Sequence, residues 1–236
     1  MLQIRDLTKI YGGGHKAVDS LTLTVEAGDI YGFIGHNGAG KTTALRAVAG
    51  ALKFDSGDIL INGTSSMEDP VLCKRQMSFI PDTPDIYAFM PGIQYLISIG
   101  DIYDVGGNER RERLQLYGDA FEIISALGDL IGSYSHGMKQ KLVIISALLH
   151  DPKLLVLDEP FVGLDPKAAH TLKQIMREQC DKGAAIFFST HVLDVAEKLC
   201  NKIAIIRDGK LVISGTMEEV KGDHSLEEQF MELIGR

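Results

Sequence analysis

The strongest constraint on the fold is an eight-residue segment, Gly35 to Thr42, which reads Gly-His-Asn-Gly-Ala-Gly-Lys-Thr and matches G-x-x-x-x-G-K-[ST]. It follows a candidate strand, Ile30 to Ile34, and opens a candidate helix, Thr42 to Ala51. In such a unit the glycines let backbone N–H groups surround a phosphate, and the helix N-terminus adds partial positive charge. We expect Lys41 to bridge the β- and γ-phosphates and the Thr42 hydroxyl to ligate Mg²⁺. The alternative is a glycine-rich loop that holds no ligand.

Two adjacent carboxylates form the second signal. Asp158 and Glu159 end an apolar run, Leu154 to Leu157. Charges at the carboxyl end of a buried strand are costly unless a cation or ligand needs them, and ligands bind α/β sheets at that edge. Asp158 is then placed to hold Mg²⁺ directly or through water, and Glu159 to deprotonate the water that attacks a γ-phosphate. The alternative is an ordinary transition from strand to loop, ended by Pro160.

Short apolar runs alternate with helical segments along most of the chain, which is typical of α/β architecture. Both parallel and antiparallel strands are expected, because some runs are continuously apolar whereas Leu21 to Val25 alternates. The remaining candidate strands are Gln3 to Leu7, Gly57 to Ile61, Met77 to Ile80, Ala185 to Ser189, Ile203 to Arg207 and Leu211 to Ile213.

Strand signals disappear between about Thr83 and Asp151, where three candidate helices follow one another: Gly92 to Tyr103, Glu109 to Leu127 and Gly137 to His150. This pattern predicts a helical block, inserted between two halves of a sheet and able to move against it. A short amphipathic helix is expected from His224 to Gly235.

Composition excludes several classes. The chain has 236 residues, 45% of them hydrophobic, as expected of one large globular domain or two small ones. Its formal net charge of -8 argues against binding nucleic acid through a broad basic face. Three scattered cysteines favour reduced thiols in a cytosolic protein. We see no secretory signal and no apolar run long enough to cross a membrane, so another chain must do any spanning.

The motifs, taken together, resemble the ATP-binding cassette (ABC) ATPase family over nearly the whole chain. Tyr134 to Gln140, Tyr-Ser-His-Gly-Met-Lys-Gln, is similar to the family signature. The segment Gly163 to Pro166 is similar to its D-loop, and Ser189-Thr190-His191 to its switch histidine. Tyr11 is placed like the aromatic residue that stacks on adenine. Several elements in the expected order are far more specific than any one of them.

The resemblance implies a P-loop NTPase fold of ABC type: a RecA-like mixed sheet core with antiparallel β pieces and an inserted helical subdomain. One cassette would span 1–236, with the core at 1–82 and 152–222, the signature subdomain at 83–151 and a C-terminal helix at 223–236. The implied ATP-binding residues are Tyr11, Gly35, His36, Asn37, Gly38, Ala39, Gly40, Lys41, Thr42 and Thr43.

Further roles follow from the same resemblance. Lys41, Glu159 and His191 would be catalytic. Asp165 would communicate across a head-to-tail dimer, formed with a second copy or a paralogous cassette. The implied contacts to ATP bound by that second copy are Ser135, His136, Gly137 and Met138, and the implied Mg²⁺ ligands are Thr42, Asp158 and Asp82.

Simpler interpretations stay open for single residues. Tyr11 can be a turn aromatic, and His191 can simply start the helix Val192 to Leu199. Ser135 and Gly137 can merely cap their helix, since serine is a preferred N-cap.

The sequence departs from the family pattern at three positions. Asp82 stands where the family usually has Gln, which adds a charge near the triphosphate unless Asp82 faces Mg²⁺ or swings away. His136 replaces a signature glycine and is expected to face solvent, although it can also add a titratable donor near the phosphate. Met138 resembles the ending found in exporter cassettes of the drug or peptide type.

The leading hypothesis is the ATPase subunit of a membrane transporter, peripheral on the cytoplasmic face of the cell membrane and bound to a transmembrane permease subunit. Closure of two cassettes on ATP would drive transport, and the short chain after Gly209 favours export. The apolar residues of segment 83–91, namely Pro84, Tyr87, Phe89 and Met90, suggest a partner-docking patch or local packing. The alternatives are a cassette acting on ribosomes or DNA, which the acidic charge and single cassette oppose, and a P-loop kinase.

Overall fold

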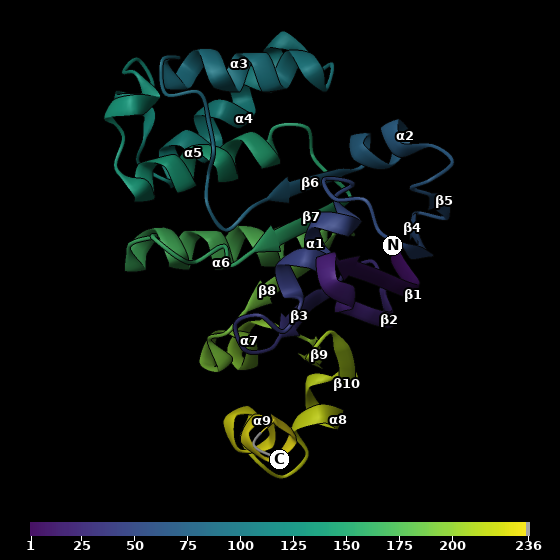
Figure 1. Cartoon of the computed structure of the whole chain (residues 1–236). Coiled ribbons are helices and arrows are strands. Elements are labelled where there is room, and N and C mark those ends of the chain that lie inside the picture. The colour runs from purple at the N-terminus through teal and green to yellow at the C-terminus, as the bar shows by residue number, and fades with distance from the viewer. Residues whose placement is uncertain (235–236) are drawn as a thin grey trace.

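The computed structural model describes residues 1–234 and contains two sheets and several layers of helices (Figure 1). The first sheet has the strand order β2-β1-β4-β5 and is antiparallel. The second has the order β10-β9-β3-β8-β7-β6 and is parallel except at its β10 edge. The strands are β1 Leu2–Tyr11, β2 His15–Val25, β3 Ile30–Ile34, β4 Ser56–Ile61, β5 Thr64–Ser65, β6 Met77–Ile80, β7 Leu154–Asp158, β8 Ala185–Thr190, β9 Lys202–Arg207 and β10 Lys210–Thr216.

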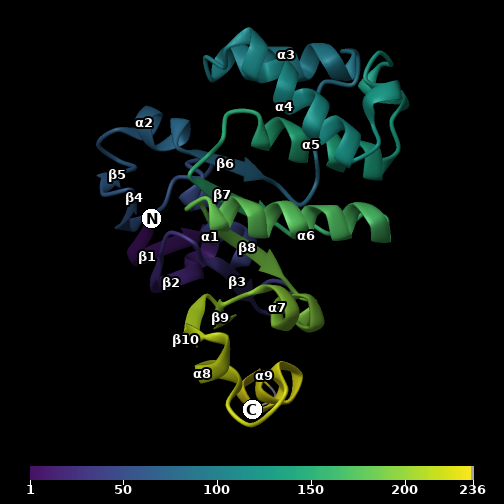
Figure 2. The ribbon, with the colours of Figure 1, turned by 180° about the vertical axis from the view of Figure 1, so that it is seen from behind.

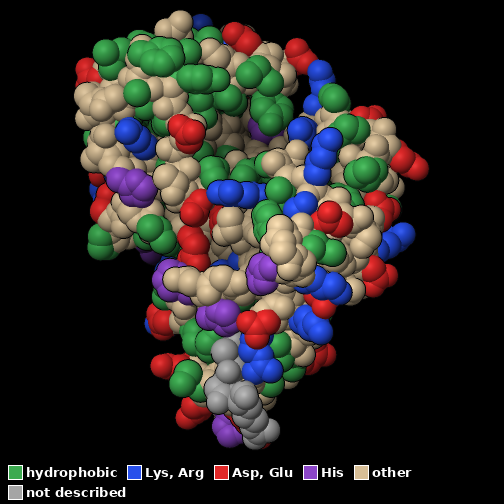
Figure 3. All heavy atoms as spheres, in the orientation of Figure 1, with side chains coloured by type: hydrophobic (Ala, Val, Ile, Leu, Met, Phe, Trp, Pro, Cys, Tyr) green, Lys and Arg blue, Asp and Glu red, His purple; other side chains and the backbone are tan. Residues whose placement is uncertain are grey.

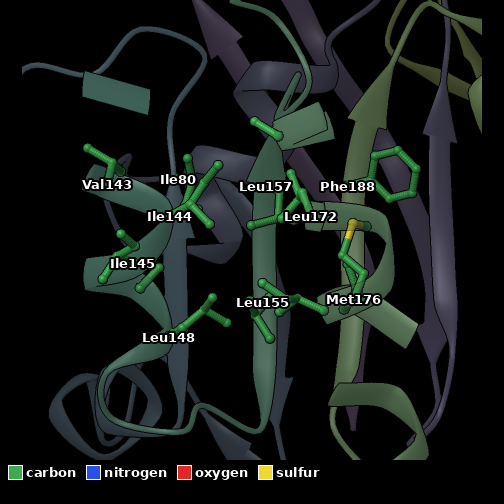
Figure 4. Close-up of a cluster of buried hydrophobic side chains, with 14 of the residues drawn as sticks. Ile80, Val143, Ile144, Ile145, Leu148, Leu155, Leu157, Leu172, Met176 and Phe188 are labelled. Carbon is green, nitrogen blue, oxygen red and sulfur yellow. The ribbon is translucent and has the colours of Figure 1, made fainter. Parts of the chain in front are cut away.

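The parallel sheet is covered on both faces, which explains why its central strands are continuously apolar. All five residues of β7 are buried, and successive side chains enter different clusters. Leu155 and Leu157 pack under α5 and α6, whereas Leu154 and Val156 face the side of α1. Figure 4 shows the first of these clusters, in which side chains of α5, β7, α6 and β8 meet. Two hydrophobic clusters, one on each face of the sheet, therefore fix the position of β7 and of its carboxyl end at Asp158.

Helices fill the rest of the chain. Three of them, α3, α4 and α5, form a block beside β6 and β7 in both ribbon views (Figures 1 and 2), as the loss of strand signals after Thr83 predicts. The helices are α1 Lys41–Val48, α2 Pro70–Arg75, α3 Gly92–Ile102, α4 Gly107–Ala120, α5 His136–Leu148, α6 Pro166–Asp181, α7 Leu193–Leu199, α8 Met217–Lys221 and α9 Leu226–Ile234.

The predicted helix Glu109 to Leu127 is wrong over its last seven residues, because α4 ends at Ala120. Glu122 adopts the left-handed conformation, with φ 54°, and turns the chain out of the helix. The returning segment then lays Ile124 on Gly118, where a built Cβ would lie only 2.3 Å from the Ile124 side chain. A close tertiary contact therefore overrides a continuous helical pattern.

An aromatic stack joins the end of the helical block to the core. Tyr103 follows α3 and His150 follows α5, and their rings are stacked. The ring centroids lie 3.6 Å apart, and the angle between the ring planes is 11°. His150 Nε2 also lies 3.3 Å from the backbone oxygen of Met77 on β6. Burial lowers the pKa of His150 to about 4, so this imidazole is neutral at physiological pH.

The chain closes on two short helices below β10 (Figure 1). A capping box at Thr216 and Glu219 starts α8, and Arg207 donates a hydrogen bond to the backbone oxygen of Leu233. The predicted C-terminal helix begins at Leu226, and its last predicted residue, Gly235, lies outside the described residues.

Among residues 1–234 no helix combines the length and the apolar character that crossing a bilayer requires.

Candidate functional site: a phosphate cleft and its carboxylates

The loop between β3 and α1 has the strand, loop and helix arrangement that its sequence predicts. Two of its glycines are required by close backbone approach. A Cβ at Gly35 would lie 2.6 Å from the Ile206 backbone oxygen, and one at Gly40 would lie 2.1 Å from that of Ala17. Gly40 also has φ 107°, which favours glycine. The loop therefore packs closely against the backbone of Ile206 and Ala17, and α1 begins directly after Gly40.

Lys41 is buried at the start of α1 and is held by the loop itself. Its Nζ donates to the backbone oxygens of Gly35 at 2.7 Å and His36 at 3.2 Å. Burial lowers the pKa of Lys41, and the negative charges of Glu159 and Asp158 oppose that shift. The ammonium therefore lies in a partly dry site beside two carboxylates, where its interaction with a phosphate would be strong.

A cleft of about 490 Å³ opens over this loop. Figure 3 shows acidic, basic and histidine side chains gathered across the middle of this face of the molecule. The cleft brings together most of the predicted ATP-binding residues and two residues that the sequence did not indicate, His15 and Ala17. The predicted residues that line it are Tyr11, Asn37, Gly38, Gly40, Lys41, Thr42, Thr43, Asp82 and Glu159.

Tyr11 ends β1 at the rim of the cleft, with 44% of the residue exposed and Lys9 Nζ 5.6 Å from its ring centroid. His36 does not line the cleft. Its Nδ1 lies 2.7 Å from the Asn37 backbone oxygen, and its Nε2 lies 3.7 Å from Asp208. Ala39 is fully buried and supports the loop from beneath.

The two carboxylates after β7 differ in environment. Asp158 is fully buried, and its Oδ1 accepts a hydrogen bond from Ser189 at 2.5 Å. Within residues 1–234 its Oδ2 has no hydrogen-bond partner. Glu159 is in the left-handed region, with φ 48°; its backbone N–H donates to Ser189 Oγ and its Oε1 lies 2.9 Å from His191 Nδ1.

Ser189 is a site residue whose role the sequence analysis missed. Its hydroxyl contacts both Asp158 and Glu159, because β8 runs parallel to β7 and pairs Ser189 with Asp158. A polar residue near the end of an otherwise apolar strand was the available signal. Only the strand order, which the sequence does not state, makes the two strand ends neighbours.

The signature residues lie away from this cleft, at the start of α5. Ser135 caps the helix, since its Oγ accepts from the Met138 backbone N–H at 3.2 Å. His136 packs on the backbone of Gly163, where a built Cβ would lie 2.2 Å from the imidazole. A Cβ at Gly137 would lie 2.7 Å from the Gly163 backbone oxygen. His136 is thus exposed as expected, and it also contacts the loop that follows Asp158 and Glu159.

Asp165 caps α6 and pairs with the same signature helix. Its Oδ1 accepts from the Ala168 backbone N–H at 2.8 Å, and its Oδ2 lies 2.9 Å from Lys141 Nζ. The hydrogen bond from Lys141, followed by that from Ala168, lowers the pKa of Asp165. Gln140 also donates to the backbone oxygen of Pro160, so α5 contacts the chain on both sides of Gly163.

Asp82 lies just after β6, with its Oδ1 3.6 Å from Arg46 Nη2 on α1. About half of each side chain is exposed. From the sequence, Asp82 is expected either to face Mg²⁺ or to swing away from the triphosphate. The structure shows that it also lies near Arg46, a cation that no motif indicated.

Asp158 and Thr42 provide oxygen atoms that could bind a Mg²⁺ ion. No group of three His, Cys, Asp or Glu side chains in the described part of the chain forms a preformed metal cluster. Mg²⁺, however, is usually held by one or two protein oxygens together with substrate phosphates and water. The buried, unpartnered Oδ2 of Asp158 and the Thr42 hydroxyl beside the loop supply that kind of donor set.

Known proteins resemble this chain in sequence and in fold. The sequence model of the family described as ABC transporter matches residues 18–162. The chain is 33% identical to the ABC-type transporter ATP-binding protein EcsA of Bacillus subtilis (strain 168), over 99% of this chain and 96% of EcsA. It is 38% identical to the bacitracin transport ATP-binding protein BcrA of Bacillus licheniformis, over 95% of this chain and 71% of BcrA.

A solved structure described as the ATP binding subunit of an ABC transporter superposes with a TM-score of 0.94 at 34% identity, and covers 99% of both chains. The P-loop fold with an inserted helical block is therefore confirmed. With the loop, the paired carboxylates and the relatives in agreement, the chain belongs to the ABC transporter family, as an ATP-binding subunit with ATPase activity.

Proposed function

We propose that the 490 Å³ cleft binds ATP with Mg²⁺ and hydrolyses it to drive export through a transmembrane permease. The observation that carries the proposal is the convergence of Lys41, Thr42 and Glu159 on one cleft, backed by the unpartnered oxygen of Asp158. In this arrangement the adenine stacks on Tyr11, and the triphosphate lies along the loop at the N-terminus of α1.

Asp158 and Thr42 would hold Mg²⁺, which neutralises charge on the phosphate oxygens when it is bound. Lys41 turns its ammonium from the carbonyls of Gly35 and His36 to the β- and γ-phosphates. The loop N–H groups bind the β-phosphate, so the chain itself fixes the orientation of the substrate.

Glu159 is the general base. It takes a proton from a water molecule whose oxygen attacks the γ-phosphorus, and the bond between that phosphorus and the oxygen bridging to ADP breaks. His191 orients this carboxylate through its Nδ1, which leaves the other ring nitrogen available to the γ-phosphate. The two residues thus act as one unit at the end of β7 and β8.

A second copy, or a paralogous cassette, completes the site. Ser135, His136, Gly137 and Met138 start a helix but line no part of their own chain's cleft. Backbone N–H groups and partial positive charge at a helix start suit the γ-phosphate of ATP bound by another subunit. Asp165, tied to α5 through Lys141, would carry the state of that contact towards Glu159.

Transport requires a membrane subunit, and the loop 83–91 offers it a surface. Tyr87 and Phe89 are 62% and 79% exposed, and their ring centroids lie 6.1 Å apart. An exposed aromatic pair between two parts of the fold suits a permease segment at the cytoplasmic face of the membrane. Export is supported by the relative BcrA, whose name refers to bacitracin transport.

The test is isothermal titration of the purified chain with ATP and Mg²⁺. The wild type should bind one nucleotide per chain, and Lys41→Ala should abolish binding because it removes the only lysine or arginine among the described residues that line the cleft. Lys53→Ala, an exposed lysine beyond the far end of α1, is the matched control and should bind normally. Absence of binding by the wild type would overturn the proposal.

A further inference from the structure

Asp82 places a second carboxylate on the lining of the cleft, in addition to Glu159. A bound triphosphate is itself strongly anionic, so an unpaired carboxylate at the rim would repel it. Lys41 cannot offset all of this negative charge, because it already faces Glu159 and Asp158. A second cation near Asp82 would therefore reduce the repulsion between this carboxylate and the triphosphate.

Arg46 is that cation. It lies one helical turn after Thr42 on α1, so its side chain emerges on the same side of the helix as the Thr42 hydroxyl. Its Nη2 is 3.6 Å from Asp82 Oδ1. Asp82 lines the cleft and Arg46 does not, so the pair links the cleft wall to α1 through a cation that lies outside the cleft lining.

We infer that Arg46 is a positioning residue that neutralises Asp82 and holds it off the triphosphate, which allows an aspartate at this place in an ATP site. The inference rests on the proposed nucleotide site and adds to it a determinant of affinity. In this inference Asp82 forms an ion pair with Arg46 and is not a ligand of Mg²⁺. Arg46 acts through Asp82 and makes no contact with ATP.

The pair is half-exposed, so its effect on folding is small and its effect on a nearby polyanion is larger. Releasing one carboxylate next to the triphosphate should weaken ATP binding roughly three- to tenfold at low salt. The loss should shrink as salt increases, because exposed charges are screened. Removal of the carboxylate itself should abolish the dependence on Arg46.

The experiment measures ATP affinity by calorimetry for the full chain, in Mg²⁺ and again in EDTA. Arg46→Gln should weaken binding, Arg46→Lys should restore most of it, and Asp82→Asn alone should bind at least as well as the wild type. The double variant Arg46→Gln/Asp82→Asn should bind like Asp82→Asn. Arg75→Gln is the matched control and should change nothing, because it breaks a comparable exposed pair between Arg75 on α2 and Asp104 after α3.

Three results would overturn the inference: normal binding by Arg46→Gln, an equal loss in the Asp82→Asn background, or a large rise in the Mg²⁺ concentration that Asp82→Asn needs for binding. The second would mean that Arg46 contacts the nucleotide, and the third that Asp82 is a metal ligand. Failure of the wild type to bind ATP would instead refute the proposed function, and the Lys41→Ala comparison separates the two cases.

Discussion

His191 and Glu159 are joined at the edge of the cleft, with Nδ1 of the imidazole 2.9 Å from Oε1 of the carboxylate. They come from the ends of β8 and β7, which are hydrogen-bonded neighbours in the sheet. Glu159 holds a left-handed backbone, which costs a non-glycine residue about 1–3 kcal/mol and is found at sites whose surroundings enforce it. The bond from its N–H to Ser189 and the contact with His191 supply that enforcement.

Glu159→Gln should keep ATP binding and slow hydrolysis by about 10²–10⁴-fold, because an amide cannot accept the proton of the attacking water. Phosphate release under saturating ATP, together with calorimetry, checks both parts. Glu112→Gln, an exposed glutamate on α4, makes the same chemical change and should leave the rate intact. An unchanged rate in Glu159→Gln would remove Glu159 from the role of base.

Ser135→Arg should permit ATP binding and prevent ATP-dependent dimerisation, since in the proposed dimer a long side chain at this position would fill the space next to the partner's γ-phosphate. Loss of the N-cap costs about 1 kcal/mol, which a cassette of this size tolerates. The measurement is size-exclusion chromatography with ATP in the Glu159→Gln background. Ser133→Arg, on the neighbouring turn, controls for bulk and charge, and dimers that persist in Ser135→Arg would contradict the shared site.

Phe89→Ser should leave the ATPase rate and stability of the isolated chain nearly unchanged, because the ring is 79% exposed and surface changes cost within about 0.5 kcal/mol. It should nevertheless reduce co-purification with the transmembrane permease. Met231→Ser, a similarly exposed apolar residue on α9, should not. Equal co-purification of both variants would place the permease contact elsewhere.

His150 should make folding pH-dependent in the mildly acidic range. Its pKa falls from 6.5 to about 4 on folding, so the unfolded chain binds the extra proton first. Its stabilisation is complete above pH 6.5 and is lost as pH falls towards 4, by up to about 3 kcal/mol. Urea unfolding of His150→Gln between pH 7 and 4.5 should show a shallower slope than the wild type.

The control for that slope is His170→Gln, because His170 is exposed on α6. It should retain the wild-type dependence on pH. A wild-type slope in His150→Gln would mean that burial of His150 is not the source of the pH dependence.

The sequence predicts the elements that carry dense local information. The loop Gly35 to Thr42, the strand ending at Asp158 and the helical period of α3 and α5 are all found as expected. The site residues nearest to these motifs meet in one cleft because parallel strands end at a common edge. Tyr11 joins them from a separate sheet, which only the resemblance to a family indicated.

What the sequence could not predict depends on contacts between distant segments. Neither Lys141 with Asp165 nor Arg46 with Asp82 follows from spacing, because each pair connects separate elements through the packed fold. The end of α4 was missed for the same reason, since Ile124 reaches Gly118 only after the chain turns. Local pattern gives the elements, and tertiary packing decides where they end and which charges meet.

The alternation of β7 between two hydrophobic clusters has one more consequence. Asp158 is braced from both sides, with Leu155 and Leu157 below the helical block and Leu154 and Val156 towards α1. The first cluster includes side chains of the helical block, such as Val143 and Ile144 on α5, whereas the second includes none. A large-to-small substitution in either cluster should therefore displace Asp158 and weaken the binding of Mg²⁺, although the substituted side chain does not contact the nucleotide.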